Sequence, residues 1–252
     1  MDAHLGFERP DYPGDQTMAD LFEGSTLSWC TLPLGAEPPS TPGAWSGKVA
    51  LLRSIGWGLA PLYRAQLDPE RGPLTSSAEQ GRADAVQAAH RAIRSNLVDG
   101  DVIYLDVAGT GALPDYLVEY AAAWFHELSA RTPFRPGVRC SHDRAAAQLR
   151  DTHPDLLVWV VNTERHRSRD AFGPDGALAR PDLAECGYPE AIAWQHVRAC
   201  TAVPFLSAGG TAGTLGSLAL AVALVSDPSR PQGPAPRVGE GSMAKGYARA
   251  RA

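Results

Sequence analysis

Residues 98–106 read VDGDVIYLD: a turn, then four apolar residues, then an acid. The Asp-Gly pair indicates a turn, and a continuous apolar run is typical of a strand that is buried on both faces. Segments with apolar residues at helical spacing lie on either side, over 76–97 and from Pro114 onward. A buried strand between two amphipathic helices is the repeating unit of an α/β fold.

The same alternation of an apolar run with a helical or irregular segment recurs along the chain. The predicted strands are 4–8, 26–32, 57–63, 102–105, 137–140, 156–161, 191–195 and 218–224. Eight parallel strands with intervening helices favour an α/β fold of one closed (β/α)8 TIM barrel over an open doubly wound sheet. Residues 162–190 are rich in Arg, Asp, Gly and Pro, and we expect irregular crossovers after the sixth and seventh strands.

Two helices carry the clearest signals. Ser76 and Glu79 have the spacing of a capping box, which predicts that the helix between the third and fourth strands begins there. Pro114 is a good first-turn residue for the next helix. The residues expected to face the core are Val86, Ala89, Ile93 and Leu97 in the first helix, and Leu117, Ala121, Trp124 and Leu128 in the second.

Composition and charge exclude one class of partner and bound the domain. The 252 residues include 23 basic and 28 acidic side chains, for a formal net charge of −5. A general nucleic-acid binder needs a basic face, so we expect no nucleic-acid partner. One barrel domain is expected over 1–228, and the Pro-, Gly- and Arg-rich residues 229–252 are expected to be a disordered tail.

We expect neither a membrane span nor a secretion signal. Residues 199–226 lack charge, but Pro204 and several glycines argue against a membrane-spanning helix. The start, MDAHLGFERP, has no basic segment followed by an apolar run, so a cytoplasmic location is expected. The four cysteines form no CxxC pair, which argues against structural zinc and predicts reduced core thiols. No metal or cofactor is expected.

Candidate site residues follow from the predicted barrel, because reactive side chains project from the carboxyl ends of its strands. Polar residues at or just after those ends are Glu8, Gln66, Asp106, Asn162 and Gln195. Two carboxylates that face each other are the minimum equipment for cleaving a glycosidic bond: one protonates the leaving oxygen and the other supports positive charge. Glu8 and Asp106 are therefore the candidate catalytic pair.

Each acid also has a structural alternative. Asp106 stands shortly before a Gly-Thr-Gly turn and could cap that turn or the following helix. Glu8 could form an ion pair with Arg9 or with another surface arginine. Spacing alone leaves these alternatives open.

Aromatic residues near the predicted strand ends could stack on sugar rings, although tryptophans are also common in cores. They are Trp45, Trp57, Trp159 and Trp194. The residues expected to bind substrate are Gln66, Trp159, Asn162, Trp194, Gln195 and His196.

Several motifs in this order resemble a known family. They are GFERPDYPGD at 6–15, AWSGK at 44–48, GWGLAPLY at 56–63, VIYLDV at 102–107, RPGVRCS at 135–141 and AWQH at 193–196. Together they resemble the bacterial glycoside hydrolase-like barrel domain that is related to the family 25 muramidases, from His4 to about Pro228. The resemblance implies a TIM barrel whose relatives are often secreted and linked to cell-wall polysaccharide.

The sequence departs from the family pattern at acid positions. The resemblance places the family's strand-four Asp-x-Glu on Asp106, Val107 and Ala108, so the glutamate that is the presumed proton donor in relatives is missing. Ala219 stands where the last-strand pattern has aspartate, and Asp227 remains from that pattern. Because an alanine methyl cannot transfer a proton, hydrolysis is expected to be weak or absent.

Three functions stay open at this point. The first is a glycoside hydrolase-like enzyme that acts through Asp106 and Glu8 on a cell-wall-type polysaccharide. The second is a non-catalytic barrel that binds glycan or a protein partner, which the alanines at 108 and 219 favour. The third is a barrel enzyme repurposed for a small molecule, with the basic segment ERHRSRDA at 164–171 near its site.

Overall fold

The computed structural model describes residues 3–35, 44–65, 77–107, 112–141, 143–163, 171–173, 176–200, 203–207, 210, 212–216 and 218–231. The strands are β1 (His4–Glu8), β2 (Leu27–Pro33), β3 (Gly58–Arg64), β4 (Val102–Val107), β5 (Arg135–Cys140), β6 (Leu157–Val161), β7 (Ala191–Cys200), β8 (Val203–Leu206), β9 (Ala212–Leu215) and β10 (Leu218–Ala223). The helices are α1 (Asp15–Gly24), α2 (Val49–Ile55), α3 (Ala78–Arg94), α4 (Asp115–Arg131), α5 (Asp143–Thr152) and the 3-10 helix η3 (Leu183–Cys186).

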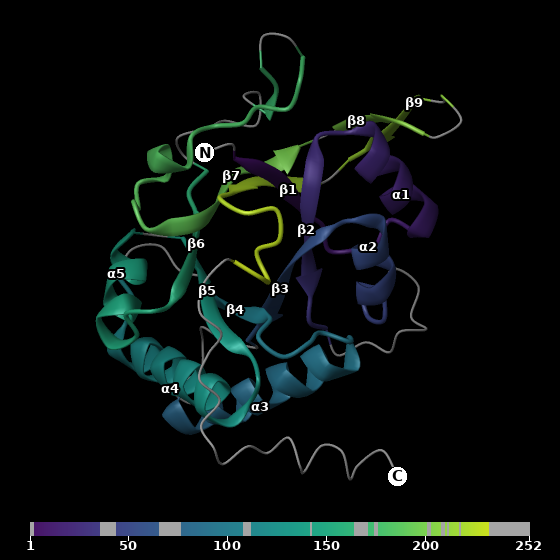
Figure 1. The fold of residues 1–252 in the computed structure, drawn as a ribbon. Helices are drawn as coiled ribbons and strands as arrows, with labels where there is room; N and C mark the ends of the chain where they lie inside the picture. The colour runs from purple at the N-terminus through teal and green to yellow at the C-terminus, as the bar shows by residue number, and fades with distance from the viewer. Residues whose placement is uncertain are drawn as a thin grey trace, which may run out of the picture.

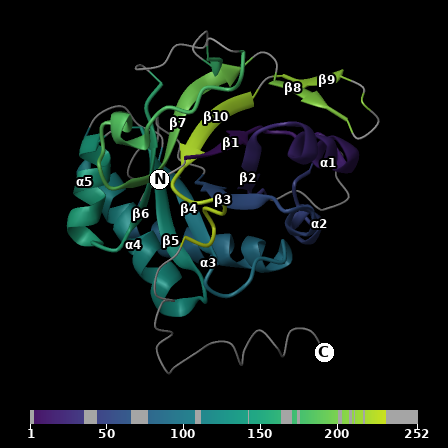
Figure 2. The ribbon, with the colours of Figure 1, turned by 45° about the horizontal axis from the view of Figure 1, so that its top comes forward.

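Eight strands close into a barrel in the order β1-β10-β7-β6-β5-β4-β3-β2, which confirms the predicted barrel. The α-helices lie outside the barrel from α1 beside β2 to α5 beside β6, and the β8–β9 hairpin lies beside α1 (Figures 1 and 2). We call the end where β1 and β4 finish the mouth, and the opposite end the base.

The direction of the last strand differs from the prediction of eight parallel strands. β10 runs antiparallel to both of its neighbours, β1 and β7. β7 finishes at the mouth, the chain forms the β8–β9 hairpin, and Leu218 then pairs with Cys200 as β10 begins. Antiparallel neighbours need no crossover, whereas a parallel strand would need one that returns the chain to the base.

Rings from β2, β4 and β6 fill the barrel interior. Trp159 contacts Trp29 edge to face at 5.6 Å between ring centroids, and Tyr104 at 5.9 Å. These three strands are not neighbours in the barrel, so their rings can meet only inside it. A Cβ at Gly6 would lie 2.1 Å from the Trp29 ring, and the glycine therefore makes the room that this large side chain occupies.

The base is closed by residues 226–230, which follow β10. Ser229 bonds through its backbone to Leu59 and Val102, near the starts of β3 and β4. Asp227 accepts the backbone N–H of Leu59 at 3.0 Å. Tyr104 donates its hydroxyl to the carbonyl of Pro228, and burial raises the pKa of that hydroxyl well above its ordinary value. Residues 227–229 are therefore held against the starts of β3 and β4.

An ion-pair cluster lies beneath this segment. Asp101 is fully buried and accepts hydrogen bonds from Arg53 and Arg230, each at 2.8 Å. It also accepts the backbone N–H of Val98 at 2.8 Å. A buried carboxylate needs such partners, because an unpaired charge in the interior is strongly destabilising.

Of the four residues predicted to face the core from the segment of helix α3, Ala89 and Leu97 are buried, and Leu97 follows the end of α3. The N-cap of α3 is Ser77, one residue after the predicted Ser76, and its side chain accepts the N–H of Gln80. Val86 and Ile93 are only half-buried. The buried face instead consists of small residues: Gly81, Ala85, Ala88, Ala89 and Ala92. Their size allows α3 to approach α4 closely, whereas the predicted residues of α4, Leu117, Ala121, Trp124 and Leu128, are buried as expected.

We expect Gly81→Ala to lower the free energy of unfolding by about 1–3 kcal/mol, as overpacked cores do. Its new Cβ would lie 2.3 Å from the carbonyl oxygen of Tyr120 in α4. Helix propensity alone predicts the opposite sign, a gain of about 1 kcal/mol. Urea unfolding of this variant, with the exposed Ala83→Gly as a calibration of propensity in the same helix, separates the two effects. A stabilised Gly81→Ala protein would contradict the close helix packing.

Two further predictions concern the cysteines and a membrane span. All four cysteines, Cys30, Cys140, Cys186 and Cys200, are free and buried, which confirms core thiols. Burial raises the pKa of the Cys30 thiol. Within the described ranges, no helix has the length and apolar character needed to cross a bilayer.

Candidate functional site at the barrel mouth

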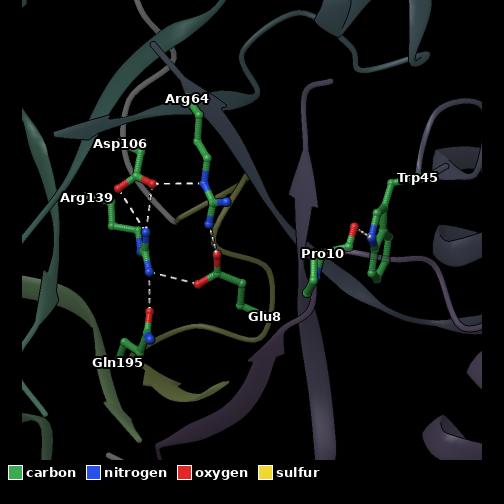
Figure 3. A network of polar contacts seen from close by, with 7 residues as sticks. All are labelled: Glu8, Pro10, Trp45, Arg64, Asp106, Arg139 and Gln195. Carbon is green, nitrogen blue, oxygen red and sulfur yellow. Dashed lines mark hydrogen bonds and ion pairs between the residues drawn. The ribbon is translucent and has the colours of Figure 1, made fainter. Parts of the chain in front are cut away.

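The structure brings the two predicted acids to one place. Glu8 ends β1, and Asp106 is the next-to-last residue of β4. Both accept hydrogen bonds from the same two arginines, Arg64 and Arg139 (Figure 3). We refer to these four residues together with Gln195 as the mouth network.

Strand register explains why three of these side chains meet. Arg64 of β3 pairs with Asp106 of β4, and Asp106 pairs with Arg139 of β5. Cross-strand partners on one face of a sheet have neighbouring side chains. The register of β3, β4 and β5 alone therefore places the Asp106 carboxylate between the guanidiniums of Arg64 and Arg139.

Arg139 is the buried centre of the network. Its Nη1 donates to both oxygens of Asp106, at 2.8 and 2.9 Å. Its Nη2 donates to Glu8 Oε2 at 2.8 Å and to Gln195 Oε1 at 2.5 Å. Its guanidinium carbon lies 5.2 Å from the centroid of the Trp159 ring, within the range of a cation–π contact. This side chain is held on several sides and is only 10% exposed.

Arg64 forms the outer part of the network. Its Nε donates to Asp106 at 3.1 Å and its Nη2 donates to Glu8 at 2.5 Å. Its side chain is 63% exposed, whereas those of Glu8 and Asp106 are 12% and 13% exposed. The two acids therefore lie under Arg64 and above Arg139.

This arrangement limits what the acids can do. Each of their four oxygens accepts an N–H from a guanidinium, and the two negative and two positive formal charges cancel. Such bonds use the oxygens as acceptors, whereas glycosidic cleavage needs one carboxylic acid that gives a proton to the leaving oxygen. The geometry favours a fixed binding surface over a proton donor.

Two further predicted residues, Gln195 and Asn162, lie at or beside the network. Gln195 is buried and joins it through Arg139. Asn162 follows β6, and its side chain donates to the carbonyl of Cys186 at 3.0 Å. Its carbonyl accepts the indole N–H of Trp194, so Asn162 anchors the crossover after β6.

The tryptophans and His196 do not offer the surfaces that sugar binding would need. Trp159 and Trp194 are fully buried, and so is His196, whose ring lies 5.7 Å from that of Trp194. Trp45 and Trp57 are also in the core; the indole of Trp45 donates to the carbonyl of Pro10 (Figure 3). Their burial agrees with the core alternative for these tryptophans, because stacking on a sugar needs an exposed ring face.

Of the two positions where alanine replaces a family acid, the structure describes Ala219. Ala219 of β10 is the register partner of Glu8, so the residue that replaces the family's aspartate lies at the mouth beside the network. Asp227, the acid that remains from the same pattern, lies at the base instead and caps the backbone there. Gln66 and Ala108 lie outside the described residues, as does most of the basic segment at 164–171.

The structure also settles what holds Glu8. Its partners are Arg64 and Arg139. Of the two alternatives for Glu8, an ion pair with another surface arginine is therefore confirmed by the exposed Arg64, whereas Arg9 donates to the carbonyl of Gly216. Neither Arg64 nor Arg139 was predicted as a site residue, although Arg64 is the last residue of β3 and could have been found by the rule that selected Glu8.

In the part of the chain that the structure describes, no group of three His, Cys, Asp or Glu side chains is placed to hold an ion.

Comparisons with known proteins agree with this architecture. The profile of a family described as "Rv2525c-like, glycoside hydrolase-like domain" matches residues 36–198. No curated protein sequence matches the chain. Among solved structures, an uncharacterized B. stearothermophilus protein is 15% identical with a TM-score of 0.55, over 87% of this chain and 95% of that chain.

Two further structures share the fold at low identity. The Tat-secreted protein Rv2525c of Mycobacterium tuberculosis, in complex with HEPES, is 15% identical with a TM-score of 0.54, over 90% of this chain and 96% of that one. The modular autolysin LytC of Streptococcus pneumoniae, in complex with a synthetic peptidoglycan ligand, is 14% identical with a TM-score of 0.53; the match covers 87% of this chain and 46% of LytC.

Proposed function

This chain belongs to the Rv2525c-like family of glycoside hydrolase-like domains, and from that premise we propose that its barrel mouth binds a cell-wall-type polysaccharide without hydrolysing it. The proposal has two parts, binding and the loss of turnover, and each has its own support.

The mouth network supports the loss of turnover. Glu8 and Asp106 are both bound by Arg64 and Arg139, and Ala219 replaces an acid directly beside Glu8. Ala108 replaces the glutamate that the family pattern assigns to proton donation. Loss of a general acid costs roughly 10²- to 10⁴-fold in rate. The charges that remain are already satisfied by each other.

The fold and its relatives support binding. LytC was crystallised with a peptidoglycan ligand, and Rv2525c with HEPES. Ligands of (β/α)8 barrels bind at the carboxyl ends of the strands, where this chain places its mouth network. A set of polar groups held in fixed positions can bind hydroxyl and charged groups of a glycan at a low cost in conformational entropy.

Two measurements on the purified protein test the proposal. Calorimetry with soluble peptidoglycan fragments is expected to detect binding. Release of reducing ends from cell-wall material is expected to stay at the level of heat-inactivated protein. Turnover above that level, together with a loss of at least about 100-fold in Asp106→Asn, would show that the network is a working catalytic site. Absence of binding heat would overturn the binding part.

A further inference from the structure

We propose that Arg64 recognises a carboxylate on the bound glycan, so that the mouth selects acidic sugars over neutral ones. This inference rests on the proposed binding function and adds the chemical class of the ligand and the residue that selects it. It starts from the unequal exposure of the groups in the mouth network.

The exposed side of the network offers hydrogen-bond donors. Arg64 uses its Nε and one N–H of Nη2 for the two acids. Its Nη1 has no partner among the described residues, and Figure 3 shows this end of the guanidinium pointing away from Glu8 and Asp106. The side chain is 63% exposed, so these unused N–H groups are open to a ligand.

The acceptors of the network are already occupied. All four carboxylate oxygens accept from an arginine, and the carbonyl oxygen of Gln195 accepts from Arg139. A cationic ligand that approached either acid would be repelled by the two arginines that bind it. An anionic ligand displaces no arginine, because it binds donors that are free.

The surrounding contacts also hold Arg64 in position. Two carboxylates bind one edge of its planar guanidinium, and Arg139 fixes those carboxylates from below. A guanidinium can bind a carboxylate through two parallel N–H···O bonds, and such charged pairs are among the stronger hydrogen bonds. A guanidinium that is already oriented loses less entropy when a ligand binds.

A carboxylate on a sugar can come from two sources: a lactyl ether, as in muramic acid, or a uronic acid. The probes are therefore N-acetylglucosaminyl-N-acetylmuramic acid, a glucuronic acid disaccharide, and the methyl ester of each. Esterification removes the charge and keeps the ring. Calorimetry gives the ratio of ester to acid dissociation constants for each protein.

The proteins compared are wild type, Arg64→Met, Arg64→Lys and Arg131→Met. Arg131 is a matched control, because its side chain is 64% exposed and it pairs with Glu127 at the far end of α4. Wild type and Arg131→Met are expected to bind at least one acid about tenfold tighter than its ester. Arg64→Met is expected to lose this preference, and Arg64→Lys to keep part of it through charge.

The ratio is measured within one protein, so it does not depend on how much of a variant is folded. Preference for one acid of the two, or for both, supports the inference and identifies the source of the carboxylate. Equal binding of acid and ester by wild type would overturn the inference and leave the binding function in place. A full preference retained in Arg64→Met would overturn the role of Arg64. No binding of any probe would overturn both proposals.

Discussion

Replacing Arg139 with methionine is expected to lower the free energy of unfolding by about 3–5 kcal/mol, the usual cost of removing one partner from a buried charge cluster. Arg139 donates to Asp106, Glu8 and Gln195, and no other described residue reaches all three. In the variant, Arg64 would be the remaining guanidinium for two carboxylates that are only 12% and 13% exposed. Chemical denaturation measures the loss.

Two comparisons show whether the loss comes from unpaired charge. Arg131→Met removes an exposed arginine from an i,i+4 helix pair with Glu127, a kind of pair that typically contributes about 0.3–0.5 kcal/mol. The triple variant Glu8→Gln, Asp106→Asn, Arg139→Met removes the stranded charges as well, and is expected to regain part of the stability. A single Arg139→Met loss no larger than that of Arg131→Met would show that the network does not stabilise the fold.

At the other end of the barrel, Asp101→Ala is expected to cost about 3–5 kcal/mol. Asp101 is fully buried, and its removal would leave Arg53 without the carboxylate that faces it and the backbone N–H of Val98 without its side-chain acceptor. It would also free Arg230 from the segment that closes the base. Thermal and chemical unfolding of the variant are the appropriate measurements.

Asp15→Ala is the control for this prediction. Asp15 pairs with Lys48 at 2.7 Å, but its side chain is 56% exposed, so the expected change is about 0–1 kcal/mol. The Lys48 hydrogen bond is the main cause that lowers the pKa of Asp15. If both aspartate variants lost the same free energy of unfolding, the buried ion pairs of Asp101 would not stabilise the fold more than an exposed pair does.

The sequence predicts most of the barrel, because each strand leaves its own local signal. The apolar run at 102–105 lies within β4, and the run at 156–161 includes the whole of β6. The direction of β10 leaves no such signal, since an apolar strand reads the same in either direction. The useful observation is indirect: no helical pattern lies between β7 and β10, and a parallel strand would need that crossover.

The predicted face of α3 is correct for Ala89 and Leu97 but not for Val86 and Ile93, and the reason is different. Periodicity ranks residues by hydrophobicity, and it favours Val86 and Ile93 over glycine and alanine. Here the short distance between α3 and α4 determines which residues are buried. Only small side chains, such as Gly81 and Ala85, leave room for that close contact.

The sequence predicts which residues lie at the strand ends of the site, but it does not predict the ion pairs that these residues form. The rule finds Glu8, Asp106 and Gln195, all of which join the mouth network. The predicted third strand stops one residue before Arg64, and Arg139 lies inside the predicted fifth strand, where the rule selects no residue. Whether an arginine binds an acid depends on how strands that are far apart in the sequence align in the barrel. A single sequence does not contain that information.

The reversed course of β10 has a practical consequence for attaching the protein to a surface. In a fully parallel barrel the final strand would deliver the chain to the same end as the mouth network. Here β10 carries it the other way, and Ser229 and Arg230 are packed at the base. A biotin or affinity handle placed after residue 231 would therefore tether the protein by its far end and leave Arg64 facing the analyte.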